Sequence, residues 1–358
     1  MFILLPREIL RIEILPCLDS ISLICLQIAL YVRPLPGALL DELQEEVISY
    51  GLSFTQYFDN LGLLDRDDLS RKAALCGQLV VLQYATEQGY YKGQFVCQWA
   101  ASGGHLECLK YTHENDYEFF EVAMSAGCEG QLECLKYAMK YEKDDRPYFL
   151  EVIAGSGHVP CVDHLVSLGY ELNVECLNNA IEMGHLGMVE YLHEHNCPQS
   201  DDEITFAAAF GQVAIIKWLH SHNYPWDGHS CIAAARHNNL ECLKYLHENG
   251  CPWDDECIYR AAIDGAVECL QYTHENGLII NDFWADTIVW RGYIDCLKYF
   301  NRQGLMTSTG LDSIAIRMNK LDCLKYLWQE GYPCNLVRRQ TSNEDTLTWI
   351  REMTELPL

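Results

Sequence analysis

The sequence repeatedly places cysteine, histidine and carboxylate side chains close together. The stretch ECLKYLHENGCPWDDE occupies residues 241–256, and related stretches begin at residues 107, 133, 268 and 322. Thiolates, imidazoles and carboxylates are ligands of Zn²⁺, and a cysteine beside a histidine is the nucleophile–base pair of cysteine hydrolases. The first question is therefore whether these residues form reactive sites or belong to a repeated structural unit.

The spacing of these stretches indicates a repeat. Position zero of each unit is defined here as the residue that aligns with Leu243. The ten residues at position zero are Leu82, Leu109, Leu135, Val162, Val189, Ile216, Leu243, Leu270, Leu297 and Leu324. Eight of the nine steps are 27 residues long, and the step from 109 to 135 is 26. A fixed period of this length is typical of stacked repeat proteins.

The residues around position zero predict a pair of helices in each unit. Position −3 is apolar in all ten units and position +2 is aromatic in nine, with His164 the exception, so we expect one buried helical face. Glycine or asparagine at −5 predicts a turn with positive φ before this helix, and the same residues at +7 in most units predict one after it. Small residues further upstream, such as Ala234 and Ala235, predict a second, closely packed helix. Asp227 and Asp254 lie at its expected N-cap.

The repetition favours a structural role for the cysteines and histidines. Neighbouring repeats would place equivalent residues about 8–10 Å apart. That separation is too long for zinc ligands, which need metal bonds of about 2.0–2.3 Å, or for a disulfide, which needs Cα atoms within about 7 Å. We therefore expect buried cysteines and helix-terminal histidines, with no catalytic residue, no metal and no cofactor. The residues at position −1 to which this applies are Cys108, Cys134, Cys161, Cys242, Cys269, Cys296 and Cys323.

The composition limits the classes of partner. The chain has 358 residues, is 49% hydrophobic and 21% charged, and carries a formal net charge of −26. This charge argues against nucleic acid and anionic membranes, and favours a target protein with a basic surface. No apolar run approaches the about 20 residues of a membrane span. Unpaired cysteines spread over a long chain indicate a reducing compartment, so we expect a cytoplasmic protein.

The pattern A-A-x-x-G-H-L-E-C-L-K-Y-L-x-x-x-G, nearly complete at residues 100–116 and 234–250, resembles the ankyrin repeat. The resemblance implies an all-α solenoid of about ten stacked helix-turn-helix repeats over residues 70–336. Ankyrin units have about 33 residues, so we expect these shorter units to carry short loops instead of β-hairpins. The sequence ECLKYLHENGCPWD is most similar to ankyrin-like arrays of large DNA viruses of amoebae and of some protists. If the protein is viral, this resemblance implies a location in the host cytoplasm.

The segment at residues 5–30, LPREILRIEILPCLDSISLICLQIAL, resembles an F-box. In that family an apolar face docks onto a Skp-type adaptor of a cullin ubiquitin ligase. The residues that carry the resemblance are Leu5, Pro6, Ile9, Leu10, Leu18, Leu23 and Leu26. The alternative is a pair of hydrophobic helices that caps the first repeat. We assign residues 1–48 to this module, 49–69 to a bridging segment and 337–358 to a C-terminal capping helix.

These features predict a protein–protein interaction adaptor without enzyme activity. The solenoid would bind a target protein and the F-box-like segment would recruit the ligase; the alternative is a plain ankyrin scaffold or inhibitor. Partner specificity is expected where the repeats vary, and the candidate loops contain Trp226, Asp227, Trp253 and Asp254. The two tryptophans are either anchors for a partner or staples that pack one loop on another.

Overall fold

The computed structural model describes residues 52, 55–56, 66, 68–90, 93, 95–142, 146, 148–332 and 343–355. These residues form helices α5 to α25 and contain no β-strand, so the predicted all-α class is confirmed. The chain divides into two compact units, unit 1 up to Tyr170 and unit 2 from Glu171. Each unit is described by itself below.

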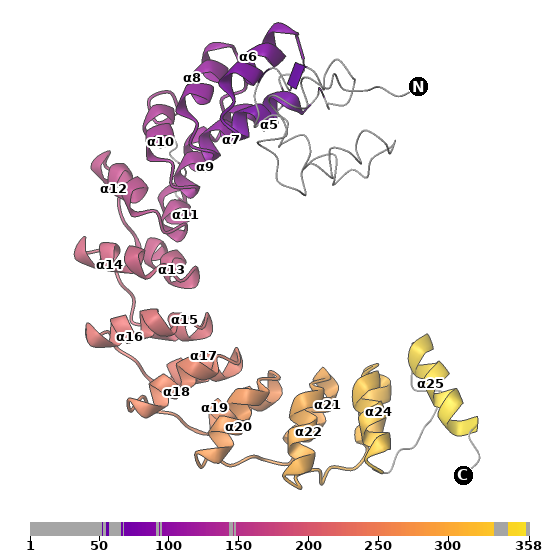
Figure 1. Cartoon of the computed structure of the whole chain (residues 1–358). Helices are drawn as coiled ribbons and strands as arrows, with labels where there is room; N and C mark the ends of the chain where they lie inside the picture. Colours follow the sequence, from indigo (N-terminus) through magenta and orange to yellow (C-terminus); the bar gives the residue numbers. More distant parts are fainter. Residues whose placement is uncertain are drawn as a thin grey trace, which may run out of the picture. The chain divides into compact units, whose positions relative to one another are not determined.

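The described part of unit 1 contains four helix pairs, in which the first helices form one layer and the second helices another (Figure 1). The pairs are α5 (Leu69–Leu75) with α6 (Leu79–Glu87), α7 (Val96–Ser102) with α8 (Leu106–Glu114), α9 (Val122–Cys128) with α10 (Leu132–Ala138), and α11 (Phe149–Gly155) with α12 (Val159–Ser167). Within unit 1, each helix packs on its partner and on the equivalent helix of a neighbouring pair.

The part of unit 2 that the structure describes shows the same pattern, with six pairs and a final helix. The pairs are α13 (Val174–Glu182) with α14 (Leu186–Glu194), α15 (Glu203–Ala209) with α16 (Val213–Ser221), α17 (Gly228–Arg236) with α18 (Leu240–Glu248), α19 (Asp255–Ile263) with α20 (Val267–Glu275), α21 (Trp284–Arg291) with α22 (Ile294–Arg302), and α23 (Leu311–Arg317) with α24 (Leu321–Gln329). Helix α25 (Glu344–Glu355) follows, inside the predicted capping segment. The described residues thus hold the ten predicted helix pairs of a helical-repeat solenoid.

The core of each repeat is formed by the positions that recur in the sequence. All ten residues at position zero are 0% exposed. The paired alanines of the first helices, such as Ala234 and Ala235, are equally buried, and their small side chains allow close helix packing. Because burying one Leu, Ile or Val side chain stabilises a protein by about 1.5–3 kcal/mol, the repeated apolar face is the main support of the array.

The glycines at position −5 are required for two reasons. The residue at −5 has positive φ in every repeat, including Asn238 and Asn319, as the sequence predicts. In addition, the first side chain after the turn of the next repeat lies over this position. A Cβ atom on Gly265 would lie 2.6 Å from the Tyr293 ring, and one on Gly104 would lie 2.2 Å from the Gln131 amide.

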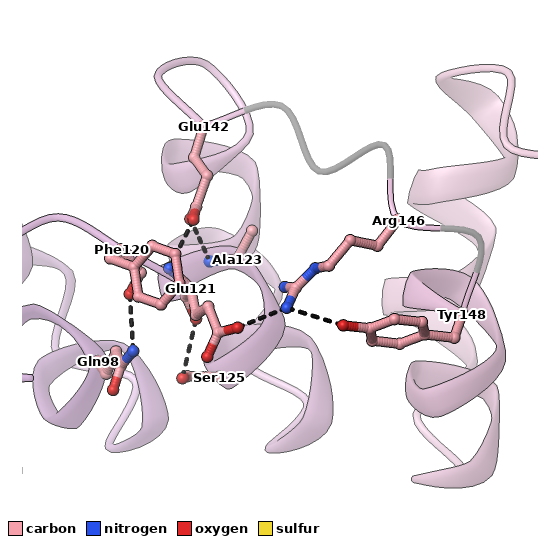
Figure 2. A network of polar contacts seen from close by, with 8 residues as sticks. All are labelled: Gln98, Phe120, Glu121, Ala123, Ser125, Glu142, Arg146 and Tyr148. Carbon is pink, nitrogen blue, oxygen red and sulfur yellow. Dashed lines mark hydrogen bonds and ion pairs between the residues drawn. The ribbon is translucent and has the colours of Figure 1, made fainter.

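One repeat lacks the turn with positive φ that is predicted at position +7. Nine of the ten residues at this position have positive φ, and Glu142 does not. Its repeat is one residue shorter, and α10 has only seven residues. The Glu142 carboxylate instead accepts hydrogen bonds from the backbone N–H groups of Glu121 (2.6 Å) and Ala123 (3.0 Å), at the start of α9 (Figure 2). A side chain from the loop after α10 therefore caps α9.

No helix in the described part of the chain has the length and apolar composition that a membrane span requires.

Candidate protein-interaction site

The repeated cysteines are core residues, as predicted. All seven cysteines at position −1 are free thiols and at most 1% exposed. Burial raises the pKa of the Cys242, Cys269 and Cys296 thiols to about 12. Because the thiolate is both the nucleophile and the metal ligand, these groups are protonated and unreactive at neutral pH. Among the residues that the structure describes, no group of three or more His, Cys, Asp or Glu side chains has a metal-binding arrangement.

The histidines at position +4 join neighbouring repeats. In unit 2, the imidazole Nδ1 atoms of three of them lie within hydrogen-bonding distance of the tyrosine hydroxyl at position +2 of the next repeat. These contacts, called the His–Tyr ladder here, are His220–Tyr245 at 3.0 Å, His247–Tyr272 at 2.8 Å and His274–Tyr299 at 2.8 Å. Asn301 continues the ladder by donating to Tyr326, and unit 1 contains the equivalent His113–Tyr137 contact. These histidines were predicted to lie at helix ends, but their contact with the tyrosines was not predicted. The signal for it is the constant spacing between position +4 of one repeat and position +2 of the next.

The loops predicted to bind a partner also make contacts within the repeat array. The Trp226 ring stacks on His220 with ring centroids 3.9 Å apart, and the Trp253 ring stacks on His247 at 3.8 Å. Both rings are half-buried. The tryptophans thus pack on the ladder histidine of the preceding helix rather than on each other's loops. Their role as partner anchors stays a prediction.

The two aspartates beside these tryptophans are N-caps, as predicted. The Asp227 carboxylate accepts from the backbone N–H of His229 at 2.9 Å, and the Asp254 carboxylate accepts from that of Glu256 at 3.0 Å. The hydrogen bond with the His229 side chain lowers the pKa of Asp227 and raises that of His229. These contacts organise the start of α17 and α19.

The predicted docking residues for a Skp-type adaptor, from Leu5 to Leu26, lie outside the described residues.

The structure points to a surface in unit 2 that the sequence analysis did not name as a site. A cavity of about 540 Å³ lies at the loop before α21 and is bordered by the start of α19 and the loop after α22. Ile279 and Phe283 line it and are 77% and 75% exposed, more than any other large hydrophobic side chain in the described residues. Asp255 and Asp282 line the same cavity. We call this surface the acidic–apolar groove.

Local contacts organise the acidic–apolar groove. The Asn281 side chain accepts from the backbone N–H of Phe283 at 3.0 Å, and Thr307 donates to the Asp282 carboxylate from the next loop. Trp284 packs on Tyr259 with ring centroids 5.3 Å apart. Apolar side chains beside carboxylates suit a protein segment with an apolar side chain next to Lys or Arg. The sequence signal is the apolar run Leu278–Ile280, which stands where the two preceding repeats have Tyr-Pro-Trp-Asp and Cys-Pro-Trp-Asp.

Unit 1 has a second exposed aromatic surface along its first helices. Phe95, Trp99, Phe120 and Tyr148 are 36–53% exposed. Arg71 lies over the Trp99 ring at 5.2 Å. Arg146 lies over the Tyr148 ring at 5.3 Å and also donates to the Glu121 carboxylate (Figure 2). Arg71 is in turn paired with the Asp68 carboxylate, so each arginine of this face has both an aromatic ring and a carboxylate as neighbours.

No protein-family model matches the sequence, and no curated protein matches it. The chain is similar to solved structures of the pentatricopeptide repeat protein PPR10. In complex with an 18-nt psaJ RNA element, that protein is 14% identical over 95% of this chain and 54% of its own length, with a TM-score of 0.34. For PPR10 from maize the identity is 15% and the TM-score 0.30. The chain therefore spans about half the length of these proteins.

The exclusion of nucleic acid as a partner was wrong. It rested on the net charge of −26, yet two of the helical-repeat structures that match are complexes with an 18-nt RNA. The physical reason is that net charge is a sum over the whole chain, whereas a ligand senses charges within a screening length of about 8 Å. The net charge of the whole chain therefore does not give the charge of any one of its faces.

Proposed function

We propose that this chain is a binding scaffold that holds a partner protein on its helical repeats and carries no catalytic residue of its own. The observation that supports this proposal is the acidic–apolar groove, where Ile279 and Phe283 stand exposed beside Asp255 and Asp282. Neighbouring exposed apolar side chains with a polar rim mark interaction surfaces, whereas single exposed apolar residues are common on any protein surface. The partner segment would carry an apolar side chain flanked by Lys or Arg.

A peptide selection tests this proposal. Random peptides are selected on the immobilised full-length chain, and the affinity of the selected sequences is measured by fluorescence anisotropy. We expect basic–apolar sequences, and we expect Phe283→Ser to weaken them by about tenfold or more because it removes an exposed anchor. Phe120→Ser, which changes an exposed aromatic residue of unit 1, is the matched control. Selected peptides that bind Phe283→Ser as tightly as the unchanged chain would contradict the proposal.

The finer proposal is that residues 1–48 recruit a Skp-type adaptor, so that the scaffold brings its target to a cullin ubiquitin ligase. Its support is the sequence resemblance of Leu5, Pro6 and the leucines that follow to an F-box. The short repeats are proposed to be ankyrin-like, with a resemblance to arrays of large DNA viruses, and the free thiols support a cytoplasmic location. The alternative is a plain scaffold or inhibitor in which residues 1–48 only cap the repeats.

A pull-down with a purified Skp-family adaptor separates these two possibilities. Capture by the full chain and loss of capture after deletion of residues 1–48 would support the ligase adaptor. Capture that survives the deletion would exclude the F-box assignment. If the full chain captures no adaptor, the plain scaffold is the better description.

A further inference from the structure

A second cavity lies in unit 1, on the layer of second helices formed by α8, α10 and α12. It has a volume of about 460 Å³, within the range of small-ligand pockets. Three lysines line it, Lys110, Lys136 and Lys140, together with His164. Among the described residues that line it, Glu133 is the only carboxylate. In a chain with a net charge of −26, this is a local reversal of sign.

The sequence creates this cavity by changing several repeat positions at once. Position +5 is Glu in five of the ten repeats but Lys140 here, and position −2 is acidic in six repeats but Pro160 here. His164 replaces the aromatic residue at +2. All three changes remove negative charge or add a basic group.

The ladder contact between neighbouring second helices is missing at the same place. Met139 occupies position +4, where six of the ten repeats have His or Asn. Because Met139 offers no nitrogen and His164 offers no hydroxyl, the ladder contact cannot form between α10 and α12. The repeat that contains α10 is also one residue short. The cavity lies where this contact is missing.

The charges of the cavity are only partly balanced. Lys110 pairs with Glu107 at 2.6 Å, and Lys136 pairs with Glu133 at 2.7 Å. Lys140 forms no ion pair with any residue that the structure describes. Burial and, to a smaller extent, the Lys136 ammonium lower the pKa of His164, against the opposite effect of Asp163 and Glu133. The lowered pKa favours the neutral imidazole, which offers both a donor and an acceptor.

We propose that this cavity binds a phosphate monoester carried on an apolar or aromatic group. Glu107 and Glu133 each pair with one of the three ammonium groups, so Lys140 leaves the cavity with a positive charge that a phosphate can neutralise, and lysine binds phosphate as a point charge. The organic group would lie against Leu106, Met139 and Leu168, which form the apolar part of the lining. The site is in the second-helix layer of unit 1 and does not depend on the proposed function of unit 2.

Titration calorimetry of the full chain with phenyl phosphate tests the proposal. We expect one bound equivalent, with weaker binding of benzoate and none of phenol. Lys140→Gln should lower the affinity about tenfold, because it removes a charge-assisted contact. Lys244→Gln, in the second helix of a unit 2 repeat, should leave the affinity unchanged. Lys140 is exposed, so this substitution does not threaten folding. Absence of binding, equal binding of benzoate, or equal effects of the two lysine variants would overturn the proposal.

Two further measurements add independent evidence. A dianion beside the imidazole stabilises its charged form, so bound phenyl phosphate should raise the pKa of His164 in a proton NMR titration; an unchanged pKa would contradict the site. A neutral peptide that contains phosphotyrosine serves as the second probe. Tighter binding of the peptide than of phenyl phosphate assigns the ligand to a phosphorylated protein, and the reverse assigns it to a free phosphate ester.

Discussion

At the scale of single residues, the contact between His247 Nδ1 and the Tyr272 hydroxyl links two neighbouring second helices, and Trp253 stacks on the same imidazole. His247, whose residue type is common in catalytic sites, thus has a structural role here. The reason is its repetition, since each ladder histidine has a tyrosine of the next repeat within reach.

Substitution of His247 by Ala should lower the stability of the chain. The change removes one hydrogen bond and one ring stack, and we expect a loss of about 1–2 kcal/mol in urea unfolding. Tyr272→Phe, which removes only the hydroxyl, should cost about 0.5–1.5 kcal/mol. His237→Ala is the control, because His237 is exposed and should change the stability by less than about 0.5 kcal/mol. An equal loss in the control would contradict a special role for the ladder.

At the scale of the elements, the turns between helices combine a backbone requirement with a packing requirement, and a matched pair of glycines separates the two. Gly250 and Gly265 have almost the same φ, 84° and 85°. A Cβ atom on Gly250 would meet nothing within 4 Å, whereas one on Gly265 would lie 2.6 Å from Tyr293.

We therefore expect Gly265→Ala to destabilise the chain more than Gly250→Ala. Both variants should lose about 1–2 kcal/mol from the left-handed backbone, and Gly265→Ala should lose more because the Tyr293 ring must move. Thermal unfolding followed by circular dichroism measures the difference. Equal losses would mean that the Tyr293 side chain adapts without cost.

The helices were largely predictable from the sequence, whereas the places where single repeats differ from the common pattern were not. The 27-residue period placed all ten helix pairs, because each buried position recurs. The capping of α9 by Glu142 escaped prediction, since it depends on how the loop after α10 passes the start of α9. The acidic–apolar groove escaped for the same reason: which apolar side chains of a loop stay exposed is decided by packing between neighbouring repeats.

At the scale of the whole molecule, a repeat array has no single centre. Within unit 2, α15 packs on α13, α16 and α17. Stability in such an array is approximately a sum of terms for single repeats and for neighbouring pairs. A defect in one repeat should therefore weaken its neighbours and leave distant repeats of the same unit protected.

Hydrogen exchange measured by mass spectrometry tests this locality. Ile204 in α15 is 0% exposed, and Ile204→Ala should cost about 2–5 kcal/mol through the cavity that it leaves. We expect amide protection to fall in α13 to α17 and to persist in α22 to α24. Leu324→Ala, in the equally buried α24 core, should give the reverse pattern. If either variant lowers protection uniformly across unit 2, the repeats unfold as one cooperative body, and binding at the acidic–apolar groove would then be sensitive to defects anywhere in the unit.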